Sequence, residues 1–130
     1  MRRDANDEAW QECKRKVYEL DKSQCLLCQA MTVQEAMQFS ASNPVNTSTI
    51  DPAHRIAVSQ RMDLMYDVDN VFCICRCHHN RLDTSRHPIT NEHCTSDVTN
   101  LFWQRIAKQR EENLKGNKKV KIPEFFFGDL

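Results

Sequence analysis

The chain has 130 residues, the length of one domain, and we treat 1–130 as a single domain. It carries 18 basic and 18 acidic residues, which argues against a protein that coats nucleic acid through bulk charge but leaves room for a local basic face. No run of about eighteen apolar residues is present, so we expect no membrane span. Only 40% of the residues are hydrophobic, which predicts a modest core held by a metal or disulfide staple.

Whether the seven cysteines form disulfides or bind metal depends on the compartment in which the protein is found. No apolar segment follows Met1–Asp4, so we expect no secretory signal and an intracellular, cytoplasmic protein. Thiols stay reduced there. The cysteines therefore favour metal ligation over disulfides, and their odd number leaves at least one spare.

The first expected element is a helix over about 4–22, capped by Asp4 or Asn6. Charged residues fill one side of it, and apolar residues recur on the other at spacings of three and four. These apolar positions are Trp10, Cys13, Val17 and Leu20. Cys13 is therefore expected in the core rather than on a metal.

Thr32 and Glu35 form the pattern of a capping box, which predicts a short helix over about 32–41. The stretch 41–49, with a proline and several Ser and Thr, is typical of a loop. Residues 50–58 are expected to be extended, because the residue before a proline disfavours the helical region.

A second strand is expected at Val71–Ile74 and a helix at about 76–83, a stretch without Gly or Pro. A longer helix is predicted over about 95–115, followed by Gly116 as its stop and by the tail 116–130. Its predicted apolar face comprises Val98, Leu101, Phe102 and Ile106. The functional core should therefore span about 23–86.

Cys25 and Cys28 are two residues apart, so one turn can supply two thiolates to a tetrahedral zinc ion. The second pair of ligands should come from the stretch 69–83, which is dense in Cys and His. The candidates are Cys75 with His78, Cys73 with Cys77, and additionally Cys94. The alternative interpretation is that these residues are buried free thiols.

His54, Asn70 and His79 suit a metal-dependent phosphodiesterase. Such an enzyme needs a base that activates water and a metal that binds the scissile phosphate, and a neutral histidine suits the first role near pH 7. On a helix, His79 and Asp83 are four residues apart and face the same way, which suits the second role. The Asn70 amide can hold a loop in shape.

The stretch DNVFCICRCHHNRLD, residues 69–83, resembles the HNH endonucleases, particularly small phage-type members with a cysteine zinc framework. Together with the earlier Cys-x-x-Cys and His54, the resemblance covers about 25–84. It implies an α+β fold, a ββα-metal finger with one structural zinc, flanked by N-terminal and C-terminal helices. It also implies a phage-encoded protein acting in the host cell. The implied zinc ligands are Cys25, Cys28, Cys75 and His78.

The same resemblance implies catalytic roles. His54 would be the general base, Asn70 would orient its loop, and His79 would hold a catalytic divalent ion, Mg²⁺, Mn²⁺, Ni²⁺ or Zn²⁺. Many members have Asp or His directly before the base histidine, where this chain has Ala53. Either Asp51 or Asp83 then takes over as a metal ligand, or the nuclease is weak.

The implied partner is DNA, duplex or branched. Arg55, Arg76 and Arg81 are candidates for phosphate contacts, with solvated surface as the alternative. The basic run 105–121 could track phosphates, and the aromatic tail Phe125–Phe127 could dock a protein partner. The competing hypothesis is a zinc-stapled DNA- or protein-binding module of the same fold, weak or inactive in catalysis.

Overall fold

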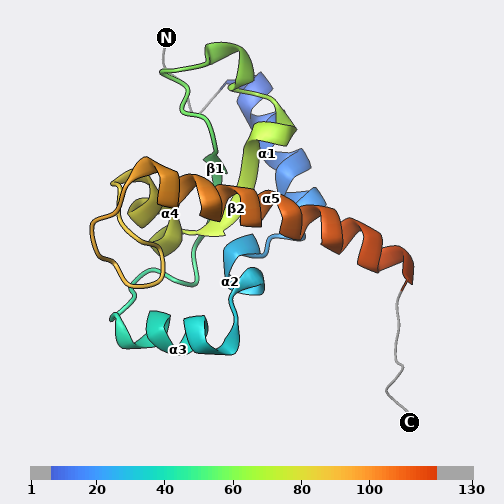
Figure 1. The fold of residues 1–130 in the computed structure, drawn as a ribbon. Helices are drawn as coiled ribbons and strands as arrows, with labels where there is room; N and C mark the ends of the chain where they lie inside the picture. The colour runs from blue at the N-terminus through green and yellow to red at the C-terminus, as the bar shows by residue number, and fades with distance from the viewer. Residues whose placement is uncertain (1–6, 120–130) are drawn as a thin grey trace.

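The computed structural model describes residues 7–119, with side chains through residue 116 (Figure 1). In the described residues, helices surround a small two-stranded antiparallel sheet. This confirms the predicted combination of helices with a small sheet. The helices and strands are α1 (Glu8–Asp21), α2 (Leu26–Ala30), α3 (Val33–Ala41), β1 (Ile50–His54), β2 (Val71–Cys75), α4 (Arg76–Asp83) and α5 (Ser96–Lys119). The aromatic tail and the end of the basic run lie outside the described residues.

The sheet pairs β1 with β2 in a register that sets His54 opposite Val71 and Ile50 opposite Cys75. Pro52 is tolerated because both strands of a two-stranded sheet are edges. The connection contains two short 3₁₀ turns, at Met62–Leu64 and Val68–Asn70. Turns this short leave no periodic pattern in the sequence.

Strand β2 is buried along its whole length because side chains on its two faces meet different clusters. Val71 and Cys73 pack against the apolar face of α1. Phe72 and Ile74 join the main core with α2 and α5. In Figure 1, α1 and α5 lie on either side of this strand.

Helix α1 begins at Glu8, and its cap is Asp7 rather than the predicted Asp4 or Asn6. The Asp7 carboxylate accepts from the backbone N–H groups of Ala9 and Trp10, which satisfies two of the free donors at a helix start. The capping box of α3 is confirmed, with Thr32 and Glu35 bonded reciprocally.

Helix α5 differs from its prediction in two ways. It continues through Gly116, because a single glycine costs only about 1 kcal/mol in a helix interior and no neighbouring atom lies within 4 Å of an added Cβ. Leu101 is 62% exposed, whereas Trp103 is buried beside Phe102 and Ile106. The buried face is thus rotated from the one predicted.

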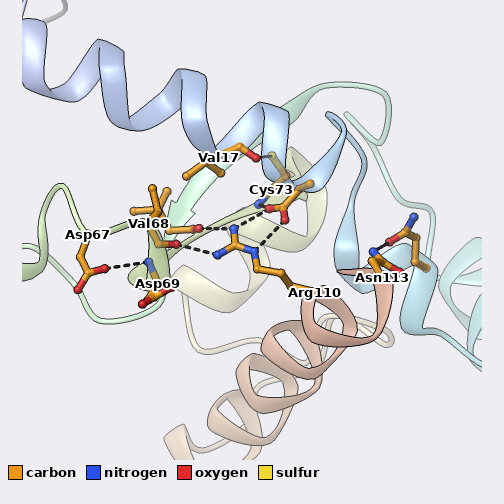
Figure 2. A network of polar contacts seen from close by, with 10 residues as sticks. Val17, Asp67, Val68, Asp69, Cys73, Arg110 and Asn113 are labelled. Carbon is orange, nitrogen blue, oxygen red and sulfur yellow. Dashed lines mark hydrogen bonds and ion pairs between the residues drawn. The ribbon is translucent and has the colours of Figure 1, made fainter. Parts of the chain in front are cut away.

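A buried ion pair joins the end of α1 to α5 (Figure 2). The Arg110 guanidinium donates to both Asp21 oxygens at 2.8 Å and to the carbonyls of Val68 and Val71 at 2.7 Å. Asp21 also accepts from the backbone N–H of Cys73 at 2.9 Å. These bonds tie both long helices to the start of β2. Within residues 7–119, no helix combines the length and apolarity needed to cross a membrane.

Candidate metal centre and adjoining cleft

Four side chains from two separate segments converge into a compact donor group. Cys25 caps α2 and Cys28 lies in its first turn, while Cys75 ends β2 and His78 lies in the first turn of α4. Their ligand atoms all lie within 4.8 Å of one another, and the group is largely buried. These four residues can hold a metal ion such as zinc.

The distances suit tetrahedral coordination. Nδ1 of His78 lies 3.6 Å from Sγ of Cys25, 3.7 Å from Sγ of Cys28 and 3.3 Å from Sγ of Cys75. Zinc bonds of about 2.3 Å to sulfur and about 2.0 Å to nitrogen place these atoms about 3.5 Å apart in a tetrahedron. The predicted Cys₃His group is therefore brought together in the geometry that zinc uses.

Charge also favours a cation at this site. Hydrogen bonds from Cys28 and Cys75 hold the pKa of the Cys25 thiol far below its usual range, whereas the contact with Cys25 raises the pKa of Cys28. One thiolate therefore forms readily, and further thiolates at this spacing need a cation to offset their repulsion. The His78 ring stacks on Phe39 with centroids 4.3 Å apart, which fixes the ring plane.

The remaining cysteines in the stretch have other surroundings. Cys73 faces α1, where its Sγ contacts the Val17 carbonyl, and burial raises its pKa to about 12. Cys77 is buried in the main core. Within residues 7–116, the Cys₃His group is the only set of three or more Cys, His, Asp or Glu residues whose ligand atoms all lie within 4.8 Å of one another. Cys73 and Cys77 do not join Cys25 and Cys28 in such a group.

A cleft of about 620 Å³ lies beside the metal centre. His54 and Arg55 line it from β1 and the following residue, and His79 and Asp83 line it from α4. Thr99, Asn100 and Trp103 of α5 close another side. The structure thus brings the two predicted catalytic histidines to one cleft, and His79 directly follows His78 of the Cys₃His group.

The His54 ring is anchored to the backbone. Its Nε2 lies 2.8 Å from the carbonyl oxygen of Met65, which can only accept, so Nε2 donates. Trp10 stacks on the imidazole with centroids 5.3 Å apart. Neither partner was predicted: a backbone carbonyl leaves no sequence signal, and Trp10 was expected only as a core residue.

Asn70 braces the loop that follows His54. Its Oδ1 accepts from the N–H of Ile56 at 2.8 Å, and its Nδ2 donates to the carbonyls of Ile56 and Leu64 at 3.0 and 3.3 Å. The Asn70 carbonyl also accepts from the N–H of Arg55 at 2.8 Å. Asn70 is 5% exposed, so it acts within the fold and does not reach the cleft.

His79 lies between two carboxylates. Its Nε2 is 3.2 Å from Asp83 Oδ2, and its Nδ1 is 3.0 Å from Asp51 Oδ2. The hydrogen bonds that His79 donates to Asp83, and then to Asp51, raise the pKa of His79 against the opposing effect of burial. Because the two acids contact different ring nitrogens, an ion bound at one nitrogen would lie next to only one of the two acids.

Asp51 has a second partner. Burial raises its pKa, but hydrogen bonds from Arg76 and His79 outweigh burial and leave the pKa lowered. The Arg76 Nη2 lies 3.0 Å from Asp51 Oδ1, and the Arg76 side chain is 49% exposed. Ala53, on the same face of β1 as Asp51, is fully buried and offers no donor.

The predicted phosphate-binding arginines lie in three different environments. Arg55 lines the cleft and Arg76 is paired with Asp51. Arg81 is only 6% exposed; it donates to the Pro88 carbonyl at 3.0 Å and lies over the Phe39 ring. This burial contradicts the prediction that Arg81 contacts phosphate: α4 turns residue 81 into the core.

Comparison with known proteins identifies no relative: no protein-family model matches the chain, and no curated protein or solved structure matches it.

Proposed function

We propose that the chain is a metal-dependent endonuclease of the HNH type that hydrolyses DNA phosphodiester bonds. The observation that carries the proposal is the convergence of His54 with the His79–Asp83 pair in one cleft, beside a Cys₃His metal centre. The order β1, β2, α4, with a histidine at the end of the first strand and another on the helix, is the order of a ββα-metal finger.

His54 is the proposed general base. With Nε2 donating to the Met65 carbonyl, Nδ1 accepts a proton from a water molecule in the cleft. The water oxygen then bonds to phosphorus in line with the departing oxygen, and that P–O bond breaks. Asn70 has an indirect role, since its three bonds fix the backbone on either side of the loop that follows His54.

His79 and Asp83 are the proposed holders of a catalytic divalent ion. An imidazole nitrogen and a carboxylate oxygen 3.2 Å apart in a cleft suit Mg²⁺ or Mn²⁺, which take few protein ligands and complete their shells with water and phosphate. Such an ion neutralises charge on the scissile phosphate and the leaving oxygen. Asp51, on the other nitrogen, fixes the ring orientation, as carboxylate partners of ligating histidines do.

Zinc is the proposed occupant of the Cys₃His group, in a structural role. Four protein donors leave no open position for a substrate. Through Cys75 and His78, the ion would join the end of β2 to the start of α4, and so fix the segment that carries His79.

A second candidate function is a zinc-stapled binding module of the same fold without catalysis. The buried Ala53 favours it, because a metal ligand common at this position in the family is replaced by a methyl group. Only two donors then face the cleft from α4.

A plasmid-nicking assay separates the two. We expect cleavage with Mg²⁺, Mn²⁺ or Ni²⁺ by the zinc-loaded protein, and loss of about 10²-fold or more in His54→Ala. His93→Ala, an exposed histidine outside the cleft, is the matched control and should cleave normally. Absence of cleavage with every metal, or equal cleavage by His54→Ala, would rule out the nuclease and leave the binding module.

A further inference from the structure

We propose that Trp10 is a positioning residue for His54, so that α1, which lies outside the HNH-like segment, forms part of the active site. The inference deepens the proposed function and rests on it for the role of His54. It comes from three contacts around His54, two of which involve the start of α1.

The first contact fixes the plane of the imidazole. The Trp10 and His54 rings stack with centroids 5.3 Å apart and an interplanar angle of 19°. The outer torsion of a histidine side chain has a broad minimum, so packing against the ring face helps to set its plane. A flat indole against that face restricts rocking of the ring.

The second contact fixes the edge of the ring. Nε2 bonds to the Met65 carbonyl at 2.8 Å, and the stack sets the plane in which that bond lies. An anchored edge and an anchored plane together determine the direction of the Nδ1 lone pair. This is the direction that a general base must hold toward its water, since small misplacements of reacting groups cost large factors in rate.

The third contact ties the two anchors to each other. Tyr66, which follows Met65, donates its hydroxyl hydrogen bond to the Asp7 carboxylate. The same carboxylate caps α1 by accepting from the N–H of Trp10. The Tyr66 hydrogen bond lowers the pKa of Asp7, which keeps the carboxylate charged as an acceptor. The start of α1 therefore holds both the indole and the segment that carries the Met65 carbonyl.

A packing role alone makes a different prediction from a positioning role. Trp10 is 7% exposed and belongs to a cluster with Val17 and Val71. If Trp10 only fills space, an apolar residue without a flat ring should affect stability but leave the His54 ring in place. If it positions His54, a planar ring is required, and Trp10→Phe should retain what Trp10→Leu loses.

The first measurement is independent of activity. Long-range ¹⁵N–¹H correlation spectra report which His54 nitrogen carries the proton. We expect one Nε2–H form in wild type and in Trp10→Phe, and a mixture of both forms in Trp10→Leu. Val17→Ala is the control, since it opens the same cluster without touching the imidazole. An unchanged spectrum in Trp10→Leu, or an equal change in Val17→Ala, overturns the proposal.

The second measurement is the kinetics of cleavage. Trp10→Leu should lower kcat about tenfold or more with KM unchanged, and Trp10→Phe should recover most of the loss. An unaltered kcat in Trp10→Leu, where cleavage depends on His54, overturns the positioning role. If wild type does not cleave beyond His54→Ala, the proposed nuclease fails, while the spectra still decide whether Trp10 holds the His54 ring.

Discussion

Asp51 and His79 meet at 3.0 Å across Nδ1, the ring nitrogen that faces away from Asp83. Asp83 lies beside the other ring nitrogen, Nε2, at 3.2 Å. We propose that Asp83 is the ligand of the catalytic ion and that Asp51 orients the His79 ring.

The two carboxylates should therefore differ in their effect on binding of Mn²⁺ to the zinc-loaded protein, measured by titration calorimetry. Asp51→Ala removes an orienting partner, and we expect the affinity to fall about 10- to 100-fold. Asp83→Ala removes a donor and should weaken binding further. Asp63→Ala, an exposed acid outside the cleft, should have no effect. If Asp51→Ala abolishes binding and Asp83→Ala does not, Asp51 is the ligand.

Cys75 and Cys77 provide a matched test of the structural metal. Both are buried cysteines of one stretch, but only Cys75 belongs to the donor group. We expect Cys75→Ala to lose its bound zinc and with it much of the folding free energy, because binding of structural zinc is coupled to folding. Cys77→Ala should keep one zinc per chain and lose only packing energy. Elemental analysis and thermal unfolding decide, and equal zinc loss in both variants would contradict the assignment.

The Cys₃His group could be predicted from the sequence because each half of it depends on short-range spacing. A Cys-x-x-Cys turn and a Cys-x-x-His turn each preset two ligands, and the resemblance selected Cys75 with His78 from the open alternatives. The structure then had only to bring two segments together. The hairpin and α4 were predictable for a similar reason, since β2 is apolar throughout and α4 lacks Gly and Pro.

Contacts that depend on the packing of distant elements could not be predicted. Arg81 lies two residues beyond His79, but its guanidinium is buried between the Phe39 ring of α3 and the Pro88 carbonyl. The sequence correctly placed Trp10 on a buried helix face. It could not show that Trp10 stacks on His54, because the two residues are 44 positions apart. Such partners have no local signature.

The burial of Arg81 predicts a contrast in DNA binding. Arg55 lines the cleft, so Arg55→Ala should weaken binding of a short duplex and reduce the slope of log affinity against log salt by about one. Arg81→Ala should lower thermal stability, because its carbonyl partners lose their donor, and should leave the salt slope unchanged. Fluorescence anisotropy over a salt series measures both. A smaller slope in Arg81→Ala would show that the side chain reaches phosphate.

Glu35 predicts a pH dependence of stability. Burial raises its pKa, but Arg105, 2.7 Å away, and the capping box outweigh burial and lower it below the ordinary glutamate value, about 4.3. A lowered pKa in the folded state adds stability above the unfolded pKa, and that stability is lost as pH falls through the folded pKa. The wild type should thus be more stable than Glu35→Gln by about 0.5–1 kcal/mol at pH 7. The difference should shrink as the pH falls below about 4.3 and vanish once the pH is below the folded-state pKa. Urea unfolding of both proteins at several pH values tests this, and a constant difference would contradict it.

Breaking the Asp21–Arg110 pair should lower stability more than breaking the Glu35–Arg105 pair, because the charges of Asp21 and Arg110 are buried away from water. Arg110→Met leaves Asp21 buried without its partner and frees the carbonyls of Val68 and Val71, so we expect a loss of about 3–5 kcal/mol. Asp21→Asn keeps an acceptor for the N–H of Cys73 and should cost less.

Urea unfolding of the zinc-loaded single variants and of the double variant gives the coupling free energy of this pair. The double variant should lose less than the sum of the single losses, since neither charge is then left buried alone. Arg15→Met, which breaks exposed ion pairs on α1, is the control and should change the unfolding free energy little. Simple additivity at positions 21 and 110 would show that the buried charges act independently, and that the junction of α1, β2 and α5 is held by packing alone.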